Sequence, residues 1–155
     1  MALYLKTLKV LPSWANGLGV VAEHWYLHCA SEATDAFLPM IGVDLDYVSR
    51  GYSYYAVETQ ITKFALLSVG DELRSDLQIL MYDQKRIQFL VTVIREGREI
   101  VAIEQMYIHV DKAVGKSCDA PSQVFERLKL FGEAHKLLPI PDVVGRSVGK
   151  SEPML

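Results

Sequence analysis

Apolar residues recur with a helical period in the first quarter of the chain. Between residues 22 and 38 they return every three to four positions, which is the spacing of one helical face. The residues on that face are Tyr26, Ala30, Ala33 and Phe37. The two alanines let the face lie close against a flat surface such as a sheet, and Pro39 ends the run because proline cannot continue a helix. The pattern predicts one long helix over 22–38.

Beyond residue 52 the apolar period falls to two, which is typical of strands. Four strands are predicted, at 53–65, 72–82, 86–94 and 99–110. The first of them places Tyr55, Val57, Thr59 and Ile61 on one side. Short turn sequences separate the four segments, and such connections predict an antiparallel meander. The rest of the chain predicts a strand at 3–11, a loop at 40–52, a second helix at 121–136 and an irregular tail after Pro139.

This order of elements indicates the fold class. One long helix followed by consecutive antiparallel strands is typical of an α+β fold in which the sheet wraps around the helix. The chain has 155 residues, which suits one domain with a sizeable core. No internal repeat and no low-complexity linker interrupts it, so we expect a single domain over 1–155.

Composition and charge limit the kinds of partner and the cellular location that are expected for this chain. Half of the residues are apolar and 23% are charged, as in folded soluble proteins, and no apolar run reaches the roughly 18 residues that span a bilayer. The net charge is −3 without a dense basic stripe, which disfavours general nucleic-acid binding. The first residues lack the pattern of a secretory leader, and two cysteines do not form a disulfide scaffold. We therefore expect a cytoplasmic protein with no membrane partner.

Short motifs along nearly the whole chain carry a family resemblance. They are Pro12-Ser13-Trp14, Gly19, Tyr26, Ala33-Thr34-Asp35-Ala36-Phe37, Val57-Glu58, Lys85-Arg86, Glu104-Gln105-Met106, His109-Val110-Asp111 and Gly145-Arg146. Together they resemble the hotdog-fold acyl-CoA thioesterases of the 4-hydroxybenzoyl-CoA type, especially the thioesterase-like branch associated with carnitine dehydrogenase. The resemblance implies a sheet of five or six strands curled around the long helix. It also implies a homodimer or a dimer of dimers, with an active site where one subunit's loop meets the partner's helix.

The chain departs from the family pattern in its opening loop. That pattern has aspartate, histidine and asparagine at the positions that Asn16, Val20 and Ala22 occupy here. Between Trp14 and Val21 no side chain ionises near neutral pH. Asn16 can orient water, but its neutral amide cannot take up a proton at pH 7. The departure therefore falls on the residues that would activate water.

Other parts of a thioesterase site remain in the sequence. Gly19 leads into the helix, so backbone N–H groups near Val21 and Glu23 can polarise a carbonyl oxygen. Hotdog enzymes also place carboxylates on the helix. The candidate catalytic residues are therefore Asn16, Glu23 and Asp35, although a solvated helix-start role for Glu23 and a structural role for Asp35 remain open. The candidate substrate-binding residues are Trp14, Gly19, Val21, His24, Trp25, Tyr26, Lys85 and Arg86.

Several of these residues have alternative interpretations. Lys85 and Arg86 either contact the phosphates of CoA or the partner subunit, or form the solvated end of a hairpin. His24 and His28 are spaced like two metal ligands, but no third ligand is evident, so no metal site and no cofactor are expected. A surface pair of His28 with Glu32 fits the helical spacing.

Several of the aromatic residues are expected to converge at one end of the fold; the candidates are Trp14, Trp25, Tyr26, Tyr47, Tyr52, Tyr54 and Tyr55. Such rings can hold a trimethylammonium group, as in betainyl-CoA, or can simply fill the core and a dimer interface. The sequence therefore favours an acyl-CoA thioesterase acting on betainyl-CoA or a short- or medium-chain acyl-CoA. A non-catalytic acyl-CoA-binding protein is the alternative, and a hotdog dehydratase or hydratase ranks last because its histidine and acid partner are poorly matched.

Overall fold

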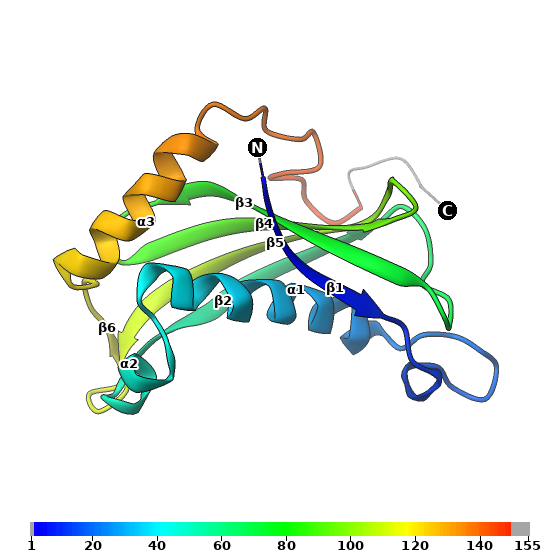
Figure 1. Cartoon of the computed structure of the whole chain (residues 1–155), viewed down its shortest axis with the longest axis horizontal. Coiled ribbons are helices and arrows are strands. Elements are labelled where there is room, and N and C mark those ends of the chain that lie inside the picture. Colours follow the sequence, from blue (N-terminus) through cyan, green and yellow to red (C-terminus); the bar gives the residue numbers. More distant parts are fainter. Residues whose placement is uncertain (1, 150–155) are drawn as a thin grey trace.

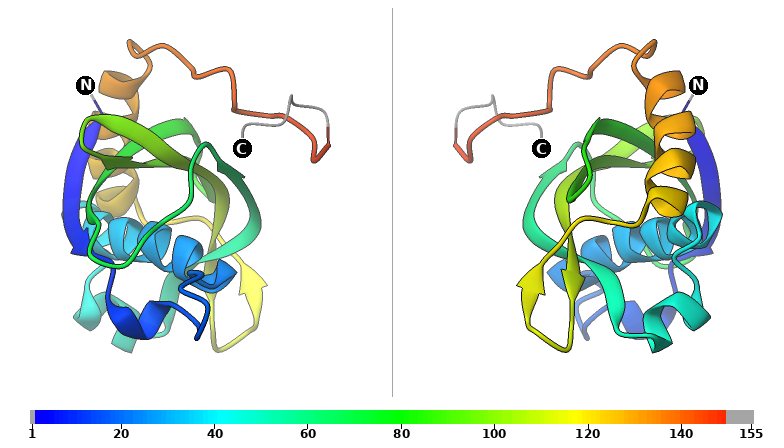
Figure 2. Two further views of the ribbon diagram at one scale, coloured as in Figure 1. Left: turned by 90° about the vertical axis from the view of Figure 1, so that its right-hand side faces the viewer. Right: turned by 90° about the vertical axis from the view of Figure 1, so that its left-hand side faces the viewer.

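A curled antiparallel sheet wraps around one central helix (Figures 1 and 2). The computed structural model describes residues 2–149. Its strands are β1 (Leu3–Lys9), β2 (Tyr52–Lys63), β3 (Glu72–Tyr82), β4 (Arg86–Arg95), β5 (Arg98–Asp111) and the short β6 (Lys116–Ser117). The helices are α1 (Glu23–Phe37), α2 (Leu45–Ser49) and α3 (Ser122–His135), with 3-10 turns η1 (Pro12–Trp14) and η2 (Leu38–Ile41). The predicted long helix, the predicted long strands and the α+β class are confirmed.

The predicted meander is wrong at one connection. The strand order is β1-β3-β4-β5-β2, with β6 on β5, so only β3, β4 and β5 follow one another across the sheet. β2 pairs with β5 at the far edge, and the segment after Lys63 carries the chain across to β3. Leu67 in that segment is buried, and its N–H donates to the Tyr26 hydroxyl at 3.0 Å. The eight residues from 64 to 71 are thus a crossover packed beside the start of α1, and Gly70-Asp71 is only its last part.

The face of α1 that packs on the sheet is the one that the helical period predicts. Tyr26, Ala30, Ala33 and Phe37 are all at most 2% exposed. The Phe37 ring meets the Phe89 ring of β4 edge-on at 5.4 Å. Because Ala30 and Ala33 have only a methyl side chain, the helix backbone can lie close to the concave side of the sheet.

An irregularity in β2 separates residues that the sequence places on one side. The pairing of β2 with β5 shifts between Ala56 and Glu58, which is the signature of a β-bulge at Val57. Tyr55 and Val57 are about half exposed, whereas Tyr54 is buried. The prediction of one continuous apolar face in this strand is therefore wrong, because the extra residue reverses the alternation.

The segment from 40 to 52, predicted as a loop, contains the five-residue helix α2. The Asp44 side chain caps it by accepting a hydrogen bond from the Tyr47 N–H at 2.9 Å. A helix of little more than one turn has too few residues to show a helical period, which explains why the sequence did not reveal it.

α3 packs along the second half of β3 at one margin of the sheet (Figure 1). Gly132 lies against the Tyr82 ring so closely that a Cβ atom at this position would be 2.3 Å from a ring carbon. The next turn brings His135, which is 3% exposed, to β3, where its Nδ1 accepts the Ile79 N–H at 2.8 Å. This bond occurs where a pairing irregularity of β3 follows Ile79.

We expect Gly132→Ala to destabilise the fold by about 1–3 kcal/mol, because the added methyl group would overlap the Tyr82 ring. This cost exceeds the roughly 1 kcal/mol that alanine gains over glycine in helix propensity. Urea unfolding of the variant measures the difference. Lys129→Ala, on the exposed side of the same helix, is the matched control and should change stability little. An unchanged unfolding free energy in Gly132→Ala would contradict the packing described.

Burial lowers the pKa of His135 below its usual value, and the hydrogen bond from Ile79 needs an unprotonated Nδ1. The unfolded chain therefore binds a proton more readily, so the stabilisation is complete above a pH of about 6.5 and is lost as the pH falls below it. Unfolding free energies at pH 7.5, 6.0 and 5.0 should show this decline. His135→Gln, which keeps an acceptor but does not titrate, should reduce the slope. Equal slopes in both proteins would refute the contribution of His135.

Candidate functional site

The loop from Trp14 to Val21 is folded around Asn16. The Asn16 Oδ1 atom accepts hydrogen bonds from the Leu18 N–H at 2.9 Å and the Val20 N–H at 3.1 Å. Gly19 has a φ of 77°, a left-handed conformation that glycine adopts without strain. The amide oxygen of Asn16 is therefore engaged in the loop itself, and its NH₂ group is the part that can still face a ligand.

The first turn of α1 lies directly behind this loop. Ala22 is the N-cap residue and offers no side-chain hydrogen bond to the helix, while its own N–H donates to the Trp14 carbonyl at 3.2 Å. The N–H groups of the first helical residues, Glu23 and His24, have no acceptor within the helix. Such a terminus carries partial positive charge and suits an anion or a carbonyl oxygen that develops negative charge.

Glu23 is tied to the far end of β2. Its carboxylate forms an ion pair with Lys63, the last residue of that strand, and remains 66% exposed. The Lys63 Nζ atom also lies 4.2 Å from the centroid of the Tyr26 ring. Sequence reasoning did not identify Lys63, because nothing in the sequence relates this residue to one that lies 40 positions earlier.

Aromatic rings fix the loop to the helix. The Trp14 and Trp25 rings stack at 4.6 Å with an angle of 3° between their planes. His28 contacts both rings edge-on, and His24 lies 4.9 Å from Trp25. The predicted pair of His28 with Glu32 is present at 3.7 Å. Trp14 and Tyr26 are both buried, so within this chain their rings belong to the core on which the loop and the first turn of α1 pack.

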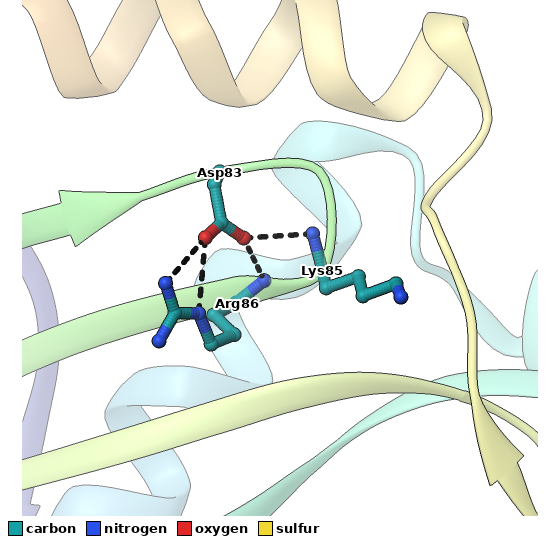
Figure 3. A network of polar contacts seen from close by, with 3 residues as sticks. All are labelled: Asp83, Lys85 and Arg86. Atoms are coloured by element: carbon teal, nitrogen blue, oxygen red, sulfur yellow. Dashed lines mark hydrogen bonds and ion pairs between the residues drawn. The ribbon is translucent and has the colours of Figure 1, made fainter.

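Lys85 and Arg86 lie at the opposite end of the molecule, in the turn between β3 and β4 (Figures 1 and 3). Asp83 holds this turn. Its two oxygens accept hydrogen bonds from the backbone N–H groups of Lys85 and Arg86 and from Nε and Nη2 of the Arg86 side chain, at 2.7–3.0 Å. The Lys85 side chain extends away from this network (Figure 3). The structure therefore does not bring the two cations to the loop of the same chain, and Lys85 is the one whose charge is not matched by Asp83.

A second aromatic group surrounds His109. The Tyr47 hydroxyl lies 2.6 Å from Nε2 of His109, and Nδ1 lies 3.0 Å from the Cys118 carbonyl oxygen. The carbonyl can only accept, so Nδ1 carries the proton and Nε2 accepts from Tyr47. Burial lowers the pKa of His109, which favours this neutral form. The Tyr52 ring stacks on His109 and the Tyr54 ring meets it edge-on, at 6.1 and 5.0 Å.

Several aromatic residues therefore converge at each end of α1, and within the single chain the tryptophans and this group of tyrosines are separate. The tryptophans lie at the start of α1, whereas Tyr47, Tyr52 and Tyr54 lie near its end, beside α2. β2 runs along α1 between these two ends. Residues at the start of the strand are consequently far from its last residue, Lys63, which pairs with Glu23 at the start of α1.

Two cavities flank the second aromatic group. One, of about 590 Å³, lies between α2 and the start of α3 and is lined by Arg50, Arg127 and Asp119 together with Tyr47, Tyr52 and His109. The other, of about 610 Å³, is a groove between the last turn of α1, α2 and the start of β2. Asp35 lines this groove, so the third catalytic candidate is placed apart from Asn16 and Glu23 of its own chain.

Residues 2–149 show neither a metal centre nor a helix that could span a membrane. No group of three or more histidine, cysteine, aspartate or glutamate side chains is arranged to hold a metal ion in this part of the chain. None of its helices is long and apolar enough to cross a membrane. Cys29 is fully buried in the core, and burial raises the pKa of its thiol to about 12.

Comparison with known proteins places this geometry in a family. The model of the thioesterase-like superfamily matches residues 10–145. The betainyl-CoA thioesterase of Pseudomonas aeruginosa is 31% identical over 143 residues, which are 90% of this chain and 90% of that protein. The L-carnitine dehydrogenase/betainyl-CoA thioesterase of Rhizobium meliloti is 41% identical over 96% of this chain. The chain spans only 30% of that relative's length.

Solved structures show the same architecture. The Staphylococcus aureus protein SAV2348 in complex with CoA superposes with a TM-score of 0.88 at 19% identity, over 99% of this chain and 98% of that one. A Pseudomonas putida KT2440 protein superposes with a TM-score of 0.83 at 30% identity, over the same shares of the two chains. The expected hotdog fold, a sheet curled around one long helix, is thereby confirmed. The chain belongs to the thioesterase-like superfamily.

Proposed function

We propose that this protein hydrolyses a CoA thioester to the free acid and CoA, and that its acyl group is betainyl. Relatives named betainyl-CoA thioesterase support both parts of the proposal. One structural observation supports thioester hydrolysis most directly: the first turn of α1 has no side-chain cap and lies behind a loop folded around Asn16. A short- or medium-chain acyl-CoA is the alternative substrate. The free thiols of Cys29 and Cys118 fit a cytoplasmic location.

The helix terminus would stabilise the transition state. Attack on the thioester carbonyl places negative charge on its oxygen, and the N–H groups of Glu23 and His24 point out of the first turn toward such a charge. Gly19 and Val21 shape the loop in front of these donors without supplying a reacting side chain. Trp14 and Trp25 hold the loop against the helix by stacking.

Activation of water would fall to Glu23. Its carboxylate is the one nearest to the helix donors, because it belongs to the first helical residue, and it is exposed to a ligand. Lys63 holds that carboxylate in place. Asn16 has the complementary role, since its NH₂ group can donate to the substrate or the water while its oxygen maintains the loop.

The active site would be completed by a second copy of the chain. β2 is an edge strand of 12 residues with Tyr55 and Val57 about half exposed, and a long apolar edge is suited to pairing with another strand. Antiparallel pairing of two β2 strands would place the Lys63 end of one beside the Tyr52 end of the other. Loop 14–21 would then meet the groove that contains Asp35, and Lys85 would be available to the phosphates of CoA.

The second candidate function is acyl-CoA binding without turnover. The engagement of the Asn16 oxygen within the loop favours it, because this residue stands where the family has its catalytic aspartate. A binding protein would show saturable binding of CoA esters in calorimetry with no release of CoA.

We expect Glu23→Gln to lower kcat by about 100-fold or more, which is the scale of a lost general base. The fold should persist, because the exposed ion pair with Lys63 contributes roughly 0–1 kcal/mol to stability. Release of CoA from betainyl-CoA and from a panel of acyl-CoA esters measures the effect. Glu32→Gln, which removes the same charge farther along α1, is the matched control and should leave kcat within about twofold.

Asn16→Asp serves as the companion variant. An aspartate can accept the same hydrogen bonds from Leu18 and Val20, so the loop should keep its fold. A gain in rate with this variant, combined with an unchanged rate in Glu23→Gln, would show that the base belongs at position 16. Wild-type protein that hydrolyses none of the esters would exclude the proposed reaction.

We further expect Val57→Lys to weaken the dimer, because two lysines near the centre of paired β2 strands would repel each other and face water. Light scattering during size-exclusion chromatography should show a shift toward monomer at micromolar protein concentration, with activity falling in parallel. Val114→Lys changes an equally exposed valine near β6 and is the control. A variant that stays dimeric and active would contradict pairing through β2.

A further inference from the structure

The groove beside Asp35 has an unusual set of charges. We call it the acyl groove. It lies between the last turn of α1, α2 and the start of β2, and it has a volume of about 610 Å³. Its lining includes two carboxylates, Asp35 and Asp44, and two phenol rings on the helix-facing side of the sheet, Tyr54 and Tyr107. None of the described residues that line it is a lysine, an arginine or a histidine.

The side chains that carry charge and aromatic character have defined positions. The Tyr107 hydroxyl is hydrogen-bonded to Thr34 at 2.9 Å, which fixes its ring beside α1. Burial raises the pKa of the Tyr107 phenol, the hydrogen bond with Thr34 lowers it, and the nearby charge of Asp35 raises it. Asp44 uses one oxygen to cap α2, through the Tyr47 N–H. Tyr54 lies on the same face of the sheet as Tyr107, because Tyr54 pairs with His109 and side chains alternate along a strand, whereas the Tyr55 side chain points to the other face.

Such a lining selects for a particular kind of acyl group. A quaternary ammonium group has no N–H to donate, so it is held by aromatic faces and by negative charge at short range. A carboxylate or phosphate would be repelled by Asp35 and Asp44. The neighbouring cavity between α2 and α3 differs in charge, because two arginines, Arg50 and Arg127, line it beside a single carboxylate, Asp119. A cationic group is therefore favoured in the acyl groove and disfavoured in that cavity.

The location also suits the reaction. In a betainyl thioester a single methylene separates the trimethylammonium nitrogen from the carbonyl carbon, so both must bind within one small region. Pairing of two β2 strands brings residues 53–56 of one copy beside the end of β2 in the second copy, where Lys63 meets Glu23. The groove of one subunit would thereby adjoin the helix terminus of the other.

We propose that the acyl groove binds the trimethylammonium group of the substrate, with Asp35 and Asp44 as its charged partners and the rings of Tyr54 and Tyr107 as its walls. This inference rests on the proposed thioesterase function and deepens it by assigning the residues that select the acyl group. Asp35 then determines specificity, which differs from the catalytic role that the sequence suggested for it.

A pair of substrates of equal shape isolates the charge. Betainyl-CoA and 3,3-dimethylbutanoyl-CoA differ only in that a neutral carbon replaces the quaternary nitrogen. We expect wild-type protein to prefer betainyl-CoA by about tenfold or more in kcat/KM, and Asp35→Asn to remove most of that preference while kcat/KM for the neutral ester changes less than about twofold. Tetramethylammonium should inhibit wild-type protein competitively and the variant more weakly.

Two further variants, Asp44→Asn and Asp46→Asn, distinguish an effect of charge in the groove from an effect on folding. Asp44→Asn removes the second carboxylate but retains a good N-cap residue for α2, so it should lower the preference for betainyl-CoA without unfolding the helix. Asp46→Asn removes the same charge from α2 at a position that is 80% exposed, paired with Arg50 and outside the groove, and it should leave the preference unchanged.

The outcomes separate this inference from the proposed function. Hydrolysis of both esters at similar rates, or an equal loss on both in Asp35→Asn, would overturn the groove assignment and leave the thioesterase function standing. If neither ester is hydrolysed, the reaction fails, and calorimetry decides the groove with glycine betaine and 3,3-dimethylbutanoate as probes. Binding of betaine that Asp35→Asn weakens would support the groove, and equal or absent binding of the two probes would refute it.

Discussion

The close approach of α1 to the concave side of the sheet is the constraint on which the rest of the molecule depends. It is possible because the side chains between the two are small: Cys29, Ala30 and Ala33 are fully buried, with Phe37 filling the space at the end of the helix. A bulkier residue at either alanine would lift the helix and separate its two ends from β2. Both regions for which we propose a role in function lie at those ends, the uncapped first turn behind the loop and the groove beside the last turn.

Periodicity in the sequence revealed the elements of this fold but not their neighbours. The helical face of α1 and the long strands were predicted because each is long enough to repeat its pattern. The pairing partner of β2 was not predicted. Alternation of apolar and polar residues indicates that a segment is a strand, but it does not indicate which strand it pairs with. The pairing of β2 with β5 joins residues far apart in the sequence, such as Tyr54 with His109, which are 55 positions apart. The bulge at Val57 and the short α2 were missed for the related reason that a single extra residue or a single turn has no period.

The same distinction applies to the site. Trp14, Asn16, Glu23 and Trp25 lie near one another in sequence as well as in space, so a motif could indicate them. The side chains that give these residues their setting come from elsewhere: Lys63 holds Glu23, and Leu67 meets Tyr26. The separation of the aromatic residues into two groups also follows from the sheet, because β2 carries its tyrosines away from the loop. The sequence could therefore indicate groups of residues that are close in the chain. Which distant residues lie near them could be known only from the folded structure.

The contact between Lys63 and Glu23 has a consequence for assembly. Lys63 ends the free edge of the sheet and Glu23 begins the central helix, so one ion pair joins the edge that we propose for pairing with a second copy to the carboxylate that we propose as the base. If substrate binds only where two copies meet, thermodynamic linkage requires it to strengthen their association by the same factor by which association strengthens its binding. The protein would then behave as a sensor of its own concentration, with an apparent affinity for substrate that rises as subunits accumulate.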